Sequence, residues 1–377
     1  MVEYFNTDIC AFVTQCGFLS KLIKINRGCR QGDPISAYLF LIGAEILTRL
    51  IQINPLIEGI KIEENEFKLT HFADDTTLML DGSQCSLQAA LNTLEVYGNI
   101  SGLRMNKEKT KLIWIGRKRH CKEKLNVNAH LEWGSTEFTL LGIDFSTNLE
   151  VISEINYKKV LEKIRKIVNQ WKTRHLTPIG RVAVIKTYIV SQCIHILSTL
   201  PRSETFLKTL NNILYSFLWN NKPDKIRRPV TILGKKQGGL QMINIHNFEK
   251  SLKVSWIEKM FKQQSTQWFK LLTTAYKNIT QIINFGDQWY IKILPKVQNL
   301  FWQNVLNDWG TFIKIRAVKN ANQLVRSCIW YNSHISQNAL FFPDWYNKGI
   351  YLVGDVLNND GKFLTIQELN SKFDSNV

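Results

Sequence analysis

The sequence lacks the cysteine and histidine patterns that bind zinc. Seven cysteines occur in 377 residues, but none belongs to a Cys-x-x-Cys pair or lies near histidines at metal-ligand spacing. This pattern excludes a zinc knuckle or zinc ribbon. It favours reduced thiols in an intracellular protein.

A signal segment and long apolar runs are also missing. The longest run, Ala37–Ala44, stops at Glu45 and is far shorter than the roughly 20 residues that span a membrane. We therefore expect a soluble protein that is not secreted and has no membrane partner.

Acidic residues are scarce in the middle of the chain. The formal net charge is +17, and residues 151–250 carry 18 Lys and Arg against 5 Asp and Glu. Residues 1–150 carry 16 against 18. Such a basic block favours a polymer of phosphates as partner, because each neutralised phosphate releases condensed counterions. A solvated basic face or an acidic membrane surface would also explain the charge taken alone.

Hydrophobic periodicity divides the chain into three regions. From 1 to 145, short strands alternate with helices, including a helix that opens at Asp33-Pro34 and a hairpin over 68–80. The region 146–225 is helical and basic, and 226–377 is a mainly helical, aromatic-rich tail. The tail holds seven of the eleven tryptophans, which we expect to be packed in a core rather than to stack on bases.

Two adjacent carboxylates, Asp74 and Asp75, lie at the expected tip of the 68–80 hairpin. Aspartate is common in ordinary turns, so a purely structural role is one interpretation. The other is nucleotidyl transfer, which needs two divalent cations about 3.5–4 Å apart held by clustered oxygen ligands. A rigid hairpin that carries two carboxylates meets that need.

A second stretch, Arg27–Ser36, combines two glycines within five residues, two arginines and the start of a helix. Glycines allow close approach of the backbone to a ligand, and helix N-termini attract anions. The spacing alone predicts a loop that contacts phosphate. Gln31 and Asp33 could equally serve the turn and the helix cap.

Together these stretches resemble the reverse transcriptases of non-long-terminal-repeat (LINE-like) retrotransposons. Arg27–Ser36 is similar to motif B of that family, Phe72–Asp75 to motif C and Gly102–Thr110 to motif D, in the family's order. Leu140–Ile143 resembles the primer-grip hairpin. Further positions resemble the thumb, namely Trp171, Leu176, Gly180-Arg181, Lys186 and Leu200-Pro201.

The resemblance implies an RNA-directed DNA polymerase of the α+β class. The expected architecture is a partial polymerase palm, with an antiparallel sheet and helices on one face, in 1–145, a helical thumb in 146–225 and a C-terminal region in 226–377. The implied partners are an RNA template, a DNA primer and dNTPs, and the implied cofactor is Mg²⁺ or Mn²⁺. Family analogy alone places such a protein in the nucleus.

The resemblance also implies roles for single residues. Asp74 and Asp75 would bind the metals, and Lys109 would protonate or neutralise the leaving pyrophosphate. A solvated surface lysine is the alternative for Lys109. The residues that would bind the incoming nucleotide are Arg30, Gln31 and Gly32. The cations expected to bind nucleic acid are Arg165, Lys166, Lys172, Arg174, Arg181 and Lys186.

The sequence departs from the family pattern ahead of motif B. Nothing there resembles motif A, which supplies the aspartate that bridges both metals, and Asp8 follows no apolar strand. We therefore expect a C-terminal part that starts after motif A, with catalysis reduced roughly thousands-fold or more in the isolated chain. One alternative is a catalytically inactive remnant that binds RNA or an RNA–DNA hybrid. Another is an interaction protein whose partial palm packs against a partner.

Overall fold

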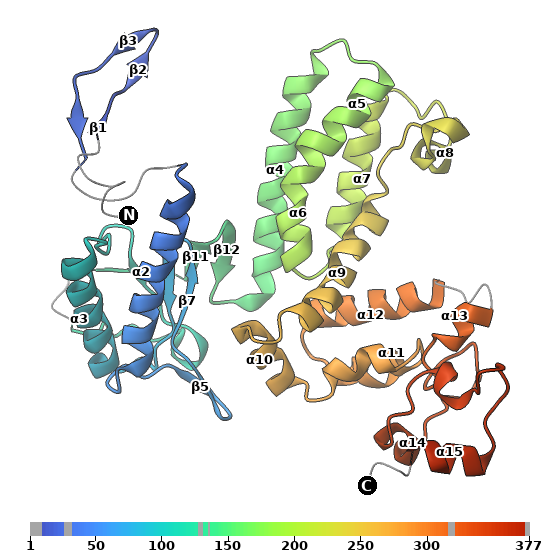
Figure 1. Ribbon diagram of the computed structural model, residues 1–377. Coiled ribbons are helices and arrows are strands. Elements are labelled where there is room, and N and C mark those ends of the chain that lie inside the picture. The colour runs from blue at the N-terminus through green and yellow to red at the C-terminus, as the bar shows by residue number, and fades with distance from the viewer. Residues whose placement is uncertain (1–9, 26–31, 127–130, 135, 316–320, 374–377) are drawn as a thin grey trace. The chain divides into compact units, whose positions relative to one another are not determined.

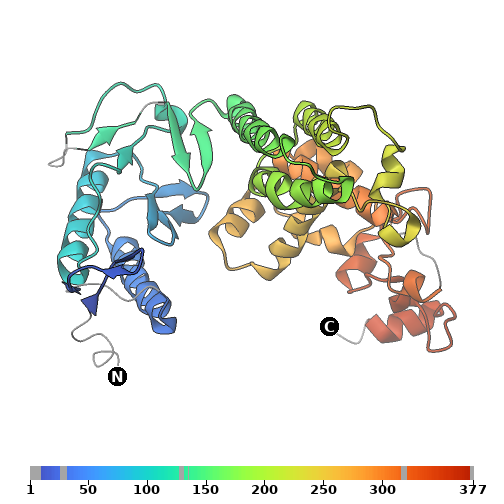
Figure 2. The ribbon, with the colours of Figure 1, turned by 90° about the horizontal axis from the view of Figure 1, so that it is seen from above.

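The computed structural model describes residues 10–25, 32–126, 131–134, 136–315 and 321–373 (Figure 1, Figure 2). The chain forms two compact units, Met1–Thr136 and Glu137–Val377. The first mixes strands and helices, and the second is mainly helical. The predicted α+β class is therefore confirmed at this level.

Two helices, α2 (Pro34–Ile53) and α3 (Gln84–Ser101), form the framework of the first unit. As predicted, α2 begins at Asp33-Pro34: the Asp33 carboxylate accepts a hydrogen bond from the Ile35 amide at 3.2 Å, and proline occupies the first turn. The helices pack together, and the Tyr97 hydroxyl of α3 donates to the Gly43 carbonyl of α2 at 2.9 Å. Their shared core buries Leu47, Ile51, Ile57, Leu69, Ala89, Ala90 and Tyr97.

The strands form six separate two-stranded ladders among the described residues, where the sequence predicted one antiparallel sheet. Five ladders are antiparallel, and β9 pairs with β10 in parallel. The strands of the first unit are β1 (Cys10–Ala11), β2 (Thr14–Gln15), β3 (Phe18–Leu19), β4 (Ile23–Lys24), β5 (Ile60–Ile62), β6 (Asn65–Phe67), β7 (Leu69–Phe72), β8 (Asp75–Leu78), β9 (Lys111–Leu112) and β10 (Glu132–Trp133). The β5–β6 and β7–β8 hairpins are neighbours, joined by a bridge between Gly59 and Leu80.

The hairpin of β11 (Glu137–Leu140) and β12 (Ile143–Ser146) belongs to the second unit. Ile143 is buried in the helical core, and Asn156 of the first long helix bonds the backbone of Asp144. These contacts explain why the boundary between the units falls at 136–137 and not at 145. The hairpin expected at Leu140–Ile143 is present, and its role in holding a primer stays a prediction.

The second unit opens with a helical bundle, in the region that the sequence predicted to be helical with a break at Thr177-Pro178. It comprises α4 (Ile152–Lys172), α5 (Pro178–Val184), a π-helical segment (Ile185–Ile189), α6 (Val190–Thr199) and α7 (Glu204–Leu218). Thr177 caps α5 through a bond from the Gly180 amide at 3.2 Å, and Pro178 starts the helix. The apolar faces of these helices meet in one core.

A second core fills the rest of the unit. The remaining helices of the unit are α8 (Arg228–Ile232), α9 (Ile245–Lys262), α10 (Gln267–Ala275), α11 (Trp289–Ile293), α12 (Leu300–Ile315), α13 (Ala321–Val325), α14 (Pro343–Asn347) and α15 (Ile366–Phe373). Turns of 3-10 helix span Gly116–Lys118 in the first unit. In the second unit they span Leu149–Val151, Lys235–Gln237, Ile279–Asn284, Leu294–Lys296 and Val353–Val356. Six of the seven tryptophans in the tail belong to this core or pack against it, and Trp330 is fully buried. The prediction that the tail aromatics serve packing is confirmed for these six.

Helix α9 connects the two cores, and a cluster of buried charges lies beside it. Arg202, just before α7, donates to Glu249 of α9 at 2.7 Å and forms an ion pair with Asp308 of α12. Lys253 of α9 is fully buried and donates to the carbonyls of Leu197, at 2.7 Å, and Leu200. We call Arg202, Glu249, Lys253 and Asp308 the charge quartet.

Two helical runs are apolar and long enough to cross a membrane by length and composition: α2 and Pro178–Thr199. The uninterrupted apolar stretch of α2 stops at Glu45, as the sequence shows, and Glu45 forms an exposed ion pair with Arg49 one turn later at 2.7 Å. The second run contributes to the helical core. Core helices of soluble proteins share these features, so the absence of a membrane partner stays a prediction.

Replacement of Lys253 by Met tests the charge quartet. Burial lowers the pKa of Lys253 to about 8, against the opposing charge of Glu249. Between pH 8 and 10, Lys253 is therefore more protonated in the unfolded chain than in the folded one. Its titration makes the free energy of unfolding increase with pH in this range. We expect Lys253→Met to lower the free energy of unfolding by about 3 kcal/mol at pH 7, because two buried carbonyls lose their donor and Glu249 loses one of its two cations. The variant should also lack the increase of stability with pH.

Denaturant unfolding followed by tryptophan fluorescence at pH 7, 8, 9 and 10 measures both effects. Lys262→Met, at the exposed end of α9, is the control and should behave like the wild type. An unchanged pH dependence in Lys253→Met would show that Lys253 does not titrate as inferred.

Candidate functional site

The β7–β8 hairpin presents Asp74 and Asp75 at its tip. Phe72 pairs with Asp75, so Ala73 and Asp74 form a two-residue turn. Ala73 has φ +51°, and a positive φ at the first turn position is typical of the turns that suit the twist of a hairpin. Both aspartates are exposed, and no described residue hydrogen bonds or pairs with their carboxylates. Two hard oxygen ligands are therefore free to bind a cation.

The base of this hairpin is anchored in the core of the first unit. Leu69 is buried, and the Thr76 hydroxyl lies 2.9 Å from Nδ1 of His71 on the opposite strand. Burial lowers the pKa of His71, although Glu45 of α2 opposes the shift. The imidazole is therefore neutral at pH 7 and adds no positive charge beside the aspartates.

The neighbouring β5–β6 hairpin has the same design. Ile62 pairs with Asn65, Glu63 and Glu64 form a two-residue turn, and Glu63 has φ +52°. Both glutamates are exposed. Two carboxylates at a tight turn therefore occur twice in this unit, so the turn geometry alone does not identify a metal site.

The described residues contain no group of three or more Asp, Glu, His or Cys side chains that could hold a metal ion. In that part of the chain, Asp74 and Asp75 are two neighbouring carboxylates without a third possible ligand beside them. The pair supplies some of the ligands that a two-metal centre needs.

The predicted nucleotide-binding loop is described only at its end. Arg30 and Gln31 lie outside the described residues. Gly32 has φ +88°, a conformation that favours glycine, and nothing lies within 4 Å of the position its Cβ would take. Asp33 serves as the helix cap, as the structural alternative stated.

Lys109 lies in an exposed turn ahead of β9. The Asn106 side chain accepts hydrogen bonds from the amides of Glu108, at 3.1 Å, and Lys109, at 3.2 Å, which fixes the turn. No described residue accepts a hydrogen bond from its ammonium group. This position suits both the catalytic and the solvated interpretation, so the role of Lys109 stays a prediction.

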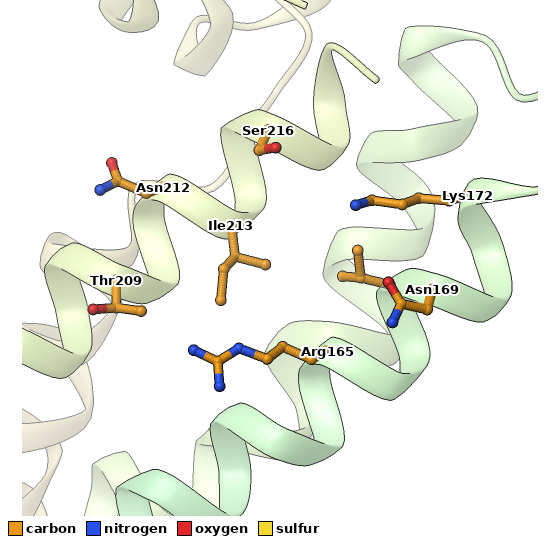
Figure 3. Close-up of a pocket in the computed structure, with 8 residues that line it drawn as sticks. Arg165, Asn169, Lys172, Thr209, Asn212, Ile213 and Ser216 are labelled. Atoms are coloured by element: carbon orange, nitrogen blue, oxygen red, sulfur yellow. The ribbon is translucent and has the colours of Figure 1, made fainter. Parts of the chain in front are cut away.

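A groove of about 370 Å³ lies between α4 and α7 (Figure 3). Its residues are Arg165, Val168, Asn169 and Lys172 from α4, and Thr209, Asn212, Ile213 and Ser216 from α7. Arg165 and Lys172 are two turns apart, so they share one side of α4, and both extend toward α7. The lining offers two cations, two hydroxyls and two amides but no carboxylate, which suits an anion such as a phosphate.

The polar residues of α7 were missed by the sequence predictions. Thr209, Asn212 and Ser216 are spaced three and four apart, so they lie on one face of α7. This periodic stripe was readable in the sequence. Only the packing of α7 beside α4 shows that it faces two cations.

The other predicted cations have different surroundings. Lys166 and Lys186 are exposed, outside the lining of the groove. The Arg174 guanidinium lies 4.7 Å from the centre of the Trp171 ring. These three side chains are accessible to a ligand, and their binding role stays a prediction.

Arg181 requires a correction. Its side chain is buried, and its guanidinium donates to the carbonyls of Phe217, at 2.8 Å, and Leu176, at 3.3 Å. It also lies 5.1 Å from the Phe217 ring. Arg181 therefore joins α5 to the end of α7 and has no free surface for a phosphate.

Comparison with known proteins gives the family of the first part of the chain. Residues 4–145 match the reverse transcriptase (RNA-dependent DNA polymerase) family. The chain is 25% identical over 317 residues to the transposon TX1 uncharacterized 149 kDa protein of Xenopus laevis. The similar region covers 79% of this chain and 23% of that protein.

Two proteins of R2 elements are also similar. The chain is 33% identical over 94 residues to the retrovirus-related Pol polyprotein from type-1 retrotransposable element R2 of Popillia japonica, covering 25% of this chain and 13% of that protein. It is 25% identical over 237 residues to the retrovirus-related Pol polyprotein from type-2 retrotransposable element R2DM of Drosophila melanogaster. That similarity covers 59% of this chain and 21% of that protein. The chain thus spans less than a quarter of the length of these three relatives.

The correction at Arg181 can be tested by stability. We expect Arg181→Met to lower the free energy of unfolding by about 2–3 kcal/mol, because two carbonyls inside the bundle lose a charged donor. Lys186→Met removes an exposed cation from the adjacent π-helical segment and should change stability by less than about 0.5 kcal/mol. Denaturant midpoints of the two variants provide the measurement, and equal midpoints would contradict the structural role.

Proposed function

We propose that this chain, which carries a reverse transcriptase domain of the non-long-terminal-repeat retrotransposon type, takes part in RNA-directed DNA synthesis. The family match over 4–145 and the TX1 and R2 relatives support the identification made from the motifs. The observation that carries the proposal is the Asp74-Asp75 pair, exposed on an anchored hairpin inside the matched region.

Asp74 and Asp75 are the residues that would hold Mg²⁺ or Mn²⁺. Their carboxylates fit hard divalent cations, and no described residue competes for them. When bound, such cations activate the attacking hydroxyl of the primer and stabilise the leaving pyrophosphate. The hairpin carries both carboxylates on one short element anchored in the core of the first unit.

The basic bundle would hold the nucleic acid. By the family match we assign the palm to 1–145, which includes the β11–β12 hairpin although that hairpin packs in the helical unit, the thumb to 146–225 and a C-terminal region to 226–377. The groove between α4 and α7 provides cations and hydroxyls for the phosphate backbone of the RNA template or DNA primer. The dNTP would contact the loop that includes Arg30, Gln31 and Gly32, and Lys109 would act on the leaving group. By family analogy, the protein would work in the nucleus.

A protein that only binds RNA would use the same groove. That alternative leaves the paired carboxylates of the hairpin without a role, and the polymerase family match supports catalysis over binding alone. Mutations that separate metal binding from RNA binding therefore distinguish the two functions.

We expect Asp74→Asn to weaken Mn²⁺ binding, with RNA affinity unchanged, and to abolish any residual primer extension by the chain on a primed RNA template. Loss of one metal ligand costs several kcal/mol of barrier, which corresponds to roughly a thousandfold or more in rate. Glu64→Gln is the matched control, because it removes one carboxylate at the same turn position of the β5–β6 hairpin. Both variants are assayed with Mg²⁺ and with Mn²⁺.

Equal loss of extension and Mn²⁺ binding in Asp74→Asn and Glu64→Gln would refute a specific site at Asp74. Mn²⁺ binding that survives in Asp74→Asn would refute its role as a ligand even if extension is slow.

The groove is tested by a double variant, Arg165→Gln with Lys172→Gln. We expect weaker RNA binding and a slope of log affinity against log salt that is shallower by about 1–2, because each lost phosphate contact removes roughly 0.7–0.9. Mn²⁺ binding should be unchanged. Replacement of Lys292 and Lys296, two exposed lysines of the tail, by Gln gives a control with equal charge. The same slope for both double variants would mean that net charge, not the groove, sets RNA affinity.

A further inference from the structure

An exposed tyrosine stands on the irregular part of the bundle. The helical run Pro178–Thr199 is interrupted by the π-helical segment Ile185–Ile189, which includes Tyr188. Such interruptions cost regular hydrogen bonding and frequently occur at functional sites. Half of the Tyr188 side chain is exposed, at 49%, while its neighbour Ile189 is fully buried.

The position of the Tyr188 ring is fixed from one side. Its centre lies 5.2 Å from that of Trp171 on α4, with 36° between the ring planes. Trp171 itself packs against the helical core, and the Arg174 guanidinium lies over its ring at 4.7 Å. An aromatic surface of fixed position is therefore formed by Tyr188, Trp171 and Arg174. We call it the platform. A ring that is already ordered loses little entropy when a ligand stacks on it.

The charge around the platform favours an anionic partner. The 41 residues from Lys163 to Ser203 contain eight Lys and Arg and no Asp or Glu. The cation of the platform is Arg174, which is exposed. An aromatic ring beside an exposed cation is suited to nucleic acid, which combines flat bases with phosphates.

The platform and the groove lie on different sides of α4. Trp171, the platform residue on α4, follows Arg165 by six residues, which places the two about 120° apart around the helix axis. None of the platform residues lines the groove. Arg165 extends toward α7, whereas the platform includes Tyr188 of the π-helical segment. The platform is therefore a separate surface from the groove.

We propose that the platform binds an unpaired base of single-stranded nucleic acid, which stacks on Tyr188 while Arg174 attracts an adjoining phosphate. The bases of a duplex are stacked on each other, so an intact duplex offers no free base face to Tyr188. The inference rests on the proposed function only in taking nucleic acid as the ligand. It requires no catalysis.

Equilibrium binding of the whole chain to a single-stranded RNA, and to a blunt duplex of the same length, tests the platform. We expect Tyr188→Ala to weaken single-strand binding about tenfold, because the stacked base is lost. Tyr188→Phe keeps the π-face and should bind as the wild type does. Duplex binding and the salt slope should stay the same in both variants, since neither removes a charge.

Two further variants keep the test decisive. Tyr188→Leu fills space beside Trp171 without a π-face, so it should fold and still lose single-strand affinity. Tyr38→Ala removes an exposed tyrosine of α2 and should leave binding unchanged. Equal losses on single strand and duplex, or wild-type affinity in Tyr188→Leu, would overturn the proposal. So would binding of the chain to phosphatidylserine vesicles that needs Tyr188 while RNA binding does not.

The platform and the polymerase can fail separately. Mn²⁺ binding that is equal in the wild type and in Asp74→Asn, together with a loss of single-strand binding in Tyr188→Leu, would remove the proposed metal site and leave the platform. Extension that needs Asp74, with single-strand binding that ignores Tyr188, would remove the platform alone.

Discussion

The helical unit depends on four charged side chains buried where its two cores meet. Removing such charges from water costs several kcal/mol each, and only close pairing offsets that cost. Arg202 meets this condition by contacting both Glu249 and Asp308, while Lys253 satisfies two carbonyls at the end of α6. The quartet thereby ties α9 and α12 to the corner from which α7 departs. The position of α7 beside α4, and so the groove, follows from that attachment.

Helix geometry then sorts the cations of α4 into different roles. One face of α4 is buried in the core through residues such as Val160 and Ile164. Cations cannot occupy that face, so they lie on its flanks or on the outer side. Arg165 and Lys172 share the flank toward α7, whereas Trp171 lies on another side of α4 and carries Arg174, from just past the end of the helix, over its ring. A single basic helix thus presents two chemically different surfaces.

Local signals in the sequence predicted elements well, whereas contacts between elements were not predictable. Asp33-Pro34 and Thr177-Pro178 mark helix starts because capping and proline act within one turn. The burial of Arg181 depends on Phe217, 36 residues away, so no local pattern distinguishes it from an exposed arginine. The same limit applies to the strands, where residue pattern predicts a hairpin but not whether hairpins join into one sheet.

The two acidic hairpins show where local geometry stops being informative. Both have a two-residue turn with positive φ at its first position and two exposed carboxylates. In the β5–β6 hairpin a further carboxylate, Glu66, accepts the Gly59 amide at 2.8 Å and lies 3.6 Å from Lys68, so it serves the fold. A metal centre needs ligands that converge from several segments, and a turn cannot encode that convergence. The order of the motifs along the chain indicates such a centre. Family resemblance, and not turn geometry, therefore identifies Asp74 and Asp75 as the candidate metal ligands.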